Sequence, residues 1–281
     1  MTDIRTEYAR LAESRLRRFR AEFGVHYAPV DCFRLVRELA SSGKIPLEYE
    51  TTRLLTAGTD ASATYLIPIQ TYLIISREPP WDWKKASASR RCNFTMAHEL
   101  GHIFCGHLRT PAEMKTPGTI RSEDLEADAF AASLLMPAEI LEQFSSVTEA
   151  ADALWVSESA VRRRLAVTGV RYTRRVCPQC GSEGLPPAAR YCRKCGLKLQ
   201  RDPNREEKPE IAWLPPSLKT CVVCGSKKPA LAGGICPYCE MPRRNHCLPE
   251  YDQPQHIVPA DALYCPACGA ETLYREYLRE S

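Results

Sequence analysis

The chain has 281 residues, of which 44% are hydrophobic, and its formal net charge is only +4. This length and composition allow one core of ordinary size with a smaller appendage, and the charge is too low to require a nucleic-acid partner. No apolar run is long enough to span a membrane, and the first residues lack the apolar core of a signal peptide. We therefore expect a cytoplasmic protein.

The cysteines are distributed unevenly along the chain. Only three of the 14 precede residue 177, and the other eleven lie between residues 177 and 268. In a cytoplasmic protein, such cysteines indicate metal binding rather than disulfides. We therefore expect a catalytic part that ends near residue 170 and a cysteine-rich tail that follows it.

The first elements of the catalytic part are predicted from the spacing of apolar residues. Residues 5–23 and 30–41 have apolar positions near helical spacing, and Gly43 is placed to end the second helix. Residues 62–76 are β-branched and aromatic on both sides of Pro68, which predicts two short strands. Such a small sheet either holds an extended substrate as an added strand or is a plain core hairpin.

The string HELGH occupies residues 98–102. Two histidines four apart on a helix share one face, so His98 and His102 can hold a single metal ion. Glu99 is placed to reach a water on that ion, as a general base, rather than the ion itself. This arrangement is typical of zinc hydrolases, whereas the alternative is a helix with two surface histidines. The apolar residues around the string favour a buried helix, in which imidazoles need partners.

Three polar residues near this helix receive no catalytic role. Arg90 and Arg91 precede the helix, and we expect them to solvate its start or to pair locally. His107 is one position off the spacing HExxHxxGxxH, in which Leu108 would have to be the third histidine. We expect His107 to be a partly exposed structural residue.

An acidic helix is predicted next, over residues 122–137, with Ser122 as its N-cap and Pro137 at its end. The run RRCNFTMAHELGH, followed by EADAFAASLLMP within this helix, resembles the ImmA/IrrE family of metallopeptidases. The resemblance covers residues 25–168, about half of the chain. It implies a peptidase fold, a catalytic zinc ion and a third zinc ligand on the acidic helix.

In the family this third ligand is a glutamate three residues before an alanine, and here Asp124 stands three residues before Ala127. An aspartate is one methylene shorter, so the helix would have to approach the histidines more closely. Glu123 and Glu126 are rivals for this role. Asp124 shares a helix face with Asp128 at i+4, whereas Glu126 points to nearly the opposite side. We expect Asp124 to be the ligand and Asp128 to orient a histidine ligand from outside.

The resemblance also implies a substrate class. Members of the ImmA/IrrE family typically cleave a helix-turn-helix repressor and so release genes for mobile elements or stress responses. Residues 150–166 themselves look like a helix-turn-helix pair. Its Arg162, Arg163 and Arg164 either contact phosphate or, as we prefer, solvate a helix that packs on the catalytic core.

The tail contains two metal motifs with the spacing CxxC-x11-CxxC. Four thiolates at this spacing make a closed tetrahedral zinc site, known as a zinc ribbon. A polar tail of this kind lacks an apolar core and would need the metal to fold. The first ribbon comprises Cys177, Cys180, Cys192 and Cys195, and the second comprises Cys221, Cys224, Cys236 and Cys239.

A third unit starts with the pair Cys265 and Cys268, 44 residues after the second ribbon begins. This pair has no second CxxC downstream in the sequence. We expect its remaining ligands to be Cys247 with His246 or His256. The alternative is a second chain, which would give a zinc-linked dimer.

These elements predict an α+β fold, in which a small mixed sheet packs on the active-site helix and a helical subdomain and tandem zinc ribbons follow. Segments 201–216 and 249–259 are predicted to be linkers because they are rich in proline and charge. The expected domains are a metallopeptidase domain at 1–147, a helix-turn-helix-like pair at 148–170, ribbons at 171–200 and 218–242, and a partial third unit at 243–281.

Two functions from different classes fit these motifs. The first is a regulatory zinc endopeptidase with one catalytic and two or three structural zinc ions, whose ribbons recognise a partner or sense a signal. The second is a non-catalytic regulator that binds nucleic acid or protein on a peptidase-like fold. The tail carries 17 basic and 12 acidic residues, but each loaded ribbon adds about −2, which weakens the charge argument for nucleic acid. The intact HELGH favours the first function, because a binding module has no need of Glu99.

Overall fold

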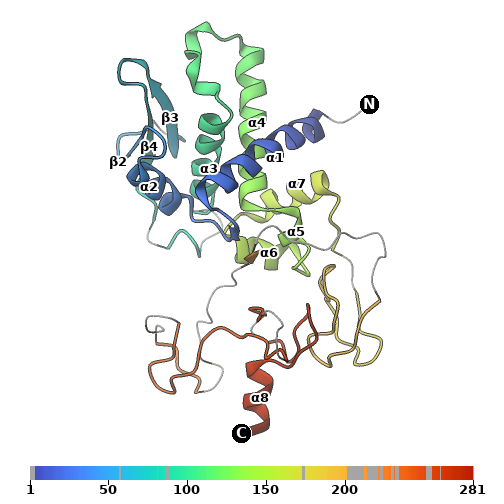
Figure 1. Ribbon diagram of the computed structural model, residues 1–281. Coiled ribbons are helices and arrows are strands. Elements are labelled where there is room, and N and C mark those ends of the chain that lie inside the picture. The colour runs from blue at the N-terminus through green and yellow to red at the C-terminus, as the bar shows by residue number, and fades with distance from the viewer. Residues whose placement is uncertain are drawn as a thin grey trace. The chain divides into compact units, whose positions relative to one another are not determined.

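The computed structural model describes residues 4–56, 58–80, 82–85, 89–172, 175–200, 212–213, 221, 224–228, 231, 234–250, 255–259 and 261–280. They divide into two compact units, one of residues 1–141 and 147–170 and one of residues 142–146 and 171–281. The first unit has the predicted α+β fold, with helices packed beside a three-stranded mixed sheet (Figure 1). The second unit contains the cysteine-rich turns.

The first unit contains seven α-helices and four strands among its described residues. The helices are α1 (Ile4–Phe23), α2 (Cys32–Ser42), α3 (Arg91–Phe104), α4 (Pro117–Leu135), α5 (Ala138–Leu141), α6 (Val147–Leu154) and α7 (Glu158–Thr168). The strands are β1 (Tyr27–Ala28), β2 (Leu47–Thr52), β3 (Ala61–Leu66) and β4 (Thr71–Arg77). The second unit contains β5 (Ala212–Trp213) and α8 (Leu273–Glu280).

The sheet has the strand order β2-β4-β3, in which β2 runs parallel and β3 antiparallel to β4. Ala63 of β3 lies opposite Ile74 of β4, and Leu47 of β2 lies opposite Tyr72. Burial alternates along β4, where Tyr72, Ile74 and Ser76 are the buried residues, so one face of this strand packs on the core. In the described part of the chain β3 is an edge strand, and it contacts α3.

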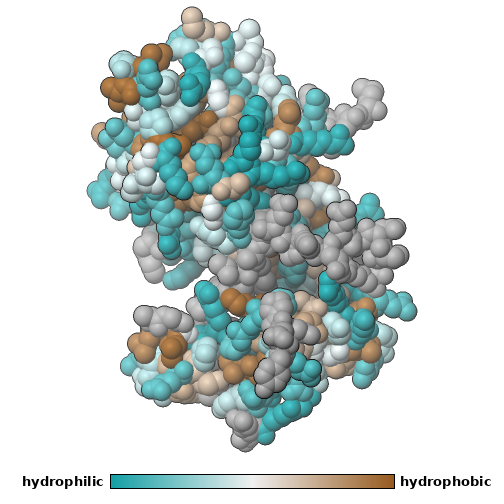
Figure 2. Space-filling view, in the orientation of Figure 1, coloured by the Kyte–Doolittle hydropathy of each residue, from teal (hydrophilic) through white to brown (hydrophobic). Residues whose placement is uncertain are grey.

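Strands β3 and β4 lie on either side of Pro68, as the sequence predicts, and a 3-10 turn at Ile67–Ile69 connects them. The spacing of apolar residues does not predict β2, because Leu47 is its only buried residue. The turn exposes Ile67 and Ile69, with 60% and 58% of their surface accessible, and hydrophobic atoms gather at this tip of the sheet (Figure 2).

The acidic helix α4 starts earlier than the sequence predicts. Thr116 is its N-cap and accepts a hydrogen bond from the Thr119 N–H, and Pro117 is its first residue. Proline suits this position because the first helical N–H groups have no partner within the helix. The expected cap, Ser122, instead lies inside the helix, 2.7 Å from the Tyr8 hydroxyl. The helix stops at Leu135, two residues before the predicted end at Pro137.

Four phenylalanines pack helices α1, α3 and α4 together. The Phe19 ring centroid lies 4.6 Å from that of Phe104 and 5.8 Å from that of Phe130. Phe23 adds an edge contact to Phe104 at 5.4 Å. Each such pair adds roughly 0.5–1.5 kcal/mol beyond the burial of its area. The cluster thereby fixes α3 against α4, and these two helices carry the site described below.

Arg90 connects the start of α3 to the helical pair α6–α7. It is 5% exposed, and its guanidinium donates to the carbonyls of Ala151 and Val156 and to the carboxylate of Asp152. Arg91, by contrast, forms an exposed ion pair with Asp60 at 2.8 Å. Arg91 thus pairs at the exposed start of the helix, as expected, whereas Arg90 is buried and bonds a distant part of the chain.

The three arginines of α7 differ in their exposure. Arg162 and Arg163 are exposed, but Arg164 is buried, so the expectation that all three are solvated is wrong for Arg164. Its guanidinium donates to the Met136 carbonyl at 3.1 Å and to the Glu13 carboxylate at 3.0 Å. Arg164 therefore fastens α7 to the catalytic core and is not available to phosphate.

The second unit is built around cysteine-rich turns rather than a large apolar core. A glycine with positive φ follows four of the CxxC pairs, for example Gly196 and Gly269. Most of the predicted linker at 201–216 lies outside the described residues. The predicted linker at 249–259 is wrong in its last part, because Val258 is 3% exposed and packs with Cys247 and Cys265. Among the described residues, no helix is both long and apolar enough to cross a membrane.

Candidate metal centre

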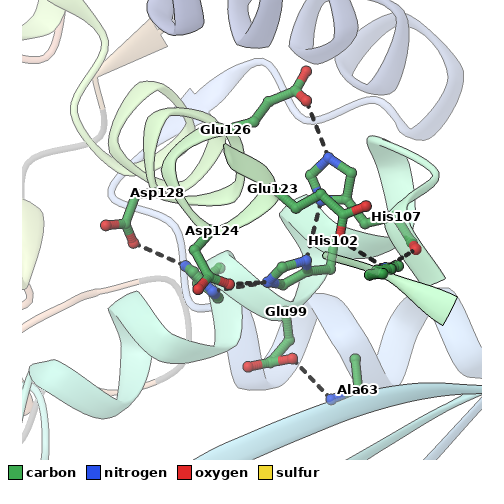
Figure 3. A network of polar contacts seen from close by, with 10 residues as sticks. Ala63, Glu99, His102, His107, Glu123, Asp124, Glu126 and Asp128 are labelled. Atoms are coloured by element: carbon green, nitrogen blue, oxygen red, sulfur yellow. Dashed lines mark hydrogen bonds and ion pairs between the residues drawn. The ribbon is translucent and has the colours of Figure 1, made fainter. Parts of the chain in front are cut away.

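Helices α3 and α4 bring together His98, His102 and Asp124. Since His98 and His102 lie one turn apart on α3, both Nε2 atoms point to the same side, 2.9 Å from each other. Asp124 of α4 places Oδ1 3.5 Å from His102 Nε2 (Figure 3). One ligand atom from each of the three residues lies within 4.8 Å of the others. Two imidazoles and one carboxylate form a donor set that fits zinc and leaves a fourth position for water.

Gly101 explains how the short aspartate reaches the histidines. A Cβ atom at Gly101 would lie 2.9 Å from both Cα and the carbonyl oxygen of Ala127 on α4. Real Cβ atoms do not come this close to backbone, so only glycine allows α3 and α4 to approach to this distance. An aspartate ligand is one methylene shorter than glutamate, so it requires α3 and α4 to lie close together. Gly101 permits this close approach.

The two rival carboxylates are engaged elsewhere. Glu123 accepts a hydrogen bond from Lys115 Nζ at 2.7 Å. Glu126 lies 3.0 Å from His107 Nε2 and 2.6 Å from the guanidinium of Arg15. Neither joins the group formed by the HELGH histidines, and Figure 3 shows both on the His107 side of α4.

Asp128 holds His98 from outside the metal position. Its Oδ1 lies 2.8 Å from His98 Nδ1, so the ring donates through Nδ1 and presents the Nε2 lone pair to the site. Burial lowers the pKa of His98, but the hydrogen bond and charge of Asp128 outweigh it and the net pKa is raised. This contact is the one expected of Asp128 from the sequence.

His107 is not the partly exposed residue that the sequence suggests. It is 7% exposed, and its Nδ1 lies 3.0 Å from Nδ1 of His102. Gly106, with φ of 78°, reverses the chain directly after α3 and turns His107 back toward the helix. Gly106, two residues after the last residue of α3, is the sequence signal for this turn.

His107 also sets the tautomer of His102. The Glu126 carboxylate can only accept, so His107 donates through Nε2 and accepts through Nδ1. His102 must then donate through Nδ1, which leaves its Nε2 lone pair free for a metal. Burial lowers the pKa of His102 to about 3, and the neighbouring His98, His107 and Lys115 lower it as well. The ring is therefore neutral, the form that binds metal.

Glu99 lies between the metal position and the edge strand β3. Its Oε2 accepts a hydrogen bond from the Ala63 backbone N–H at 2.8 Å (Figure 3). Burial raises the pKa of Glu99 to about 6, although His98 and the Ala63 N–H lower it. A carboxylate whose pKa lies near neutrality is suited to accept and return a proton.

Two groups of four cysteines in the second unit have almost the same geometry. In the first ribbon, Sγ of Cys177 lies 3.6 Å from that of Cys195, and in the second, Sγ of Cys221 lies 3.5 Å from that of Cys239. All four sulfurs of each group lie within 4.8 Å of one another. The backbone N–H of Cys180 bonds to Cys177 and lowers its pKa to about 6, which favours a thiolate. Both groups are consistent with structural zinc.

The third unit brings together Cys247, Cys265, Cys268 and His256. Cys247 Sγ lies 3.6 Å from His256 Nδ1 and 3.9 Å from Cys268 Sγ. Of the two histidines left open by the sequence, His256 joins this group and His246 does not. A set of three cysteines and one histidine is also consistent with structural zinc.

Two segments of the chain match known protein families. Residues 84–166 match the family model of the IrrE N-terminal-like domain of the M78 peptidases, and residues 175–240 match the double zinc ribbon. A solved structure of a Mycobacterium tuberculosis transcriptional regulator is similar at 14% identity and a TM-score of 0.40. That similarity covers 64% of this chain and 54% of the regulator, so the chain spans about half of its length. A search of curated proteins gives no match. The chain thus contains an IrrE N-terminal-like domain of the M78 peptidase family, followed by zinc ribbons.

Proposed function

We propose that the chain is a zinc-dependent endopeptidase with a regulatory role. The observation that carries this proposal is the convergence of His98, His102 and Asp124 on one point, with Glu99 beside it. A domain that only bound a partner would need neither the carboxylate of Glu99 nor two histidines held in the metal-binding tautomer. The match to an M78 peptidase domain over residues 84–166 supports the same reaction class.

The residues divide the work of peptide hydrolysis among them. His98, His102 and Asp124 would hold zinc, which when bound polarises the scissile carbonyl and acidifies a water molecule. Glu99 takes the proton of that water and returns it to the amine leaving group. The Ala63 N–H holds Oε2 of Glu99 and so fixes the direction in which the other oxygen points.

The outer edge of β3 is the proposed binding site for an extended substrate. The Arg77 N–H donates to the Asp60 carbonyl, so even-numbered residues of this segment face β4. Ala61, Ala63 and Tyr65 therefore direct their backbone groups away from β4 and toward the side of α3. Within the described residues no strand covers this edge. A peptide added there as a strand would run past Glu99.

We also propose that the substrate is a protein such as a helix-turn-helix transcriptional repressor. This substrate class follows from the resemblance to ImmA/IrrE peptidases and is a matter of analogy rather than of site geometry. The ribbons would then recognise the partner or sense a signal. The proposed cofactors are one catalytic and two or three structural zinc ions.

A substrate trap tests this proposal. Tagged wild type and Glu99→Gln are expressed in the native host and purified with their partners, which mass spectrometry identifies. Glu113→Gln, at an exposed position, serves as the matched control. A protein that is enriched intact on Glu99→Gln, and shortened in cells with the other two forms, would establish the peptidase and its substrate. If all three forms retain the same intact partners or nucleic acid, the non-catalytic regulator becomes the better account.

A further inference from the structure

Two segments of the second unit share the pattern Y-C-x-x-C-G and contact each other reciprocally. One is residues 191–196 of the first ribbon, and the other is residues 264–269 of the third unit. A Cβ atom at Gly196 would lie 2.8 Å from the Tyr264 ring, and one at Gly269 would lie 2.7 Å from the Tyr191 ring. Each tyrosine thus packs on the glycine of the other segment.

Backbone hydrogen bonds between the two segments are reciprocal as well. The N–H groups of Arg190 and Tyr191 donate to the Pro266 carbonyl at 2.8 and 3.1 Å. At the equivalent positions, the N–H groups of Leu263 and Tyr264 donate to the Arg193 carbonyl at the same two distances. The two segments are therefore related as a pseudo-symmetric pair, which a chance contact between loops would not produce.

In the third unit, the turn at residues 265–270 has the same backbone hydrogen bonds as the equivalent turn of the first ribbon. The Cys265 N–H donates to the Ala270 carbonyl and the Gly269 N–H to the Cys265 carbonyl, at 2.8 and 2.9 Å. In the first ribbon, Cys192 and Gly196 make the same two bonds, both at 2.9 Å. Cys247 and Cys265 are fully buried, and His256 also donates its N–H to Cys247 Sγ at 3.1 Å.

The second ribbon lacks the residues that make this pairing possible. Ile235 precedes Cys236 where the other two segments have tyrosine, and Glu240 follows Cys239 where they have glycine. Glu240 does adopt the positive φ of 58°, but it carries a Cβ atom, which at Gly196 and Gly269 would lie within 3 Å of the partner ring. The matched double zinc ribbon spans residues 175–240, yet the contacts join the first ribbon to a unit beyond that range.

We propose that Cys247, His256, Cys265 and Cys268 bind a third structural zinc ion, and that this site and the first ribbon form one interlocked double ribbon. The second ribbon is outside this pair and holds its zinc independently. Loss of metal from the third site therefore loosens the first ribbon through the Tyr–Gly contacts, although the two sites share no ligand.

Cysteine alkylation of the zinc-loaded full chain, mapped by mass spectrometry during treatment with a chelator, tests this inference site by site. Gly269→Ala removes the room for Tyr191 but keeps every ligand. Gly181→Ala and Gly225→Ala are matched controls, because both glycines have φ of +68° and open space at Cβ. Total zinc is measured in parallel on the untreated proteins.

The inference predicts four zinc ions in the wild-type chain and protection of Cys247, Cys265 and Cys268 until chelator is added. Gly269→Ala should speed alkylation of the first ribbon's cysteines about tenfold. This factor is typical of the energetic coupling between residues in contact. The second ribbon should be unaffected, because it is outside the pair. Immediate alkylation of the third unit in loaded wild type would refute the zinc site. An unchanged first ribbon in Gly269→Ala would refute the interlock.

Discussion

His107 Nδ1 lies 3.0 Å from His102 Nδ1, on the side of the ring that faces away from the metal position. Asp128 has the same relationship to His98, at 2.8 Å. Each histidine of HELGH is thus held by its own partner, a carboxylate for the first and a histidine backed by Glu126 for the second. Both partners thereby orient the Nε2 atoms of His98 and His102 toward the candidate metal position.

His107→Phe should weaken zinc binding at the catalytic site about 10- to 100-fold, the usual effect of losing a residue that orients a metal ligand. Phenylalanine fills the buried space but cannot accept the proton of His102 Nδ1. Zinc competition with a chromophoric chelator measures the affinity. His26→Phe, at an exposed position, is the control. Equal affinity in both variants would mean that His107 is merely a packing residue.

Asp124→Ala should abolish zinc binding in the catalytic unit while the ribbons keep theirs. Glu123→Ala should retain the catalytic zinc, because Glu123 pairs with Lys115 rather than with the histidines. Metal analysis of both variants, read against the wild-type zinc content, separates the two carboxylates. Retention of the catalytic zinc by Asp124→Ala would remove Asp124 as the ligand.

Gly101→Ala should destabilise the first unit by about 1–3 kcal/mol, because the added methyl group meets the backbone of Ala127 and overpacks the helix interface. Zinc affinity should fall as well, since α4 must move away from α3. Gly118→Ala is the opposite case, a helical glycine with only an ordinary contact at 3.7 Å. That change should be neutral or stabilise by about 0.5–1 kcal/mol. Urea unfolding curves test both signs, and equal effects would argue against a constrained approach of the helices.

Arg90→Leu should cost on the order of 3 kcal/mol, because it leaves the buried carbonyls of Ala151 and Val156 without their donor. Arg91→Leu removes an ion pair whose arginine is 68% exposed, and should cost less than about 1 kcal/mol. Thermal unfolding of the two variants gives the comparison. Similar melting temperatures would show that Arg90 does not hold the helical pair in place.

Local patterns in the sequence predict much of the first unit. Gly43 ends α2, Pro68 separates β3 from β4, and the four-residue spacing of HELGH places two imidazoles on one face. The sequence also contains the correct start signal of α4, the pair Thr116-Pro117. Ser122 and the acidic residues after it form a second acceptable N-cap signal. Propensity alone does not decide between two acceptable caps.

The contacts that the sequence does not predict depend on where the chain returns in space. His107 reaches His102 only because Gly106 reverses the chain, and Ala63 reaches Glu99 only because β3 is the edge strand. His256 joins Cys247 across a segment that composition marks as a linker. Each depends on tertiary packing, to which apolar periodicity and residue spacing are insensitive.

The central claim is that Glu99 and the metal bound by HELGH cleave peptide bonds. The most direct measurement labels new protein N-termini in a native-host extract treated with the zinc-loaded full chain or with its Glu99→Gln variant at equal zinc content. The account predicts a small set of new N-termini, confined to one or a few proteins, that appear with wild type and not with Glu99→Gln. Identical N-termini from the two forms, with zinc present in both, would contradict it.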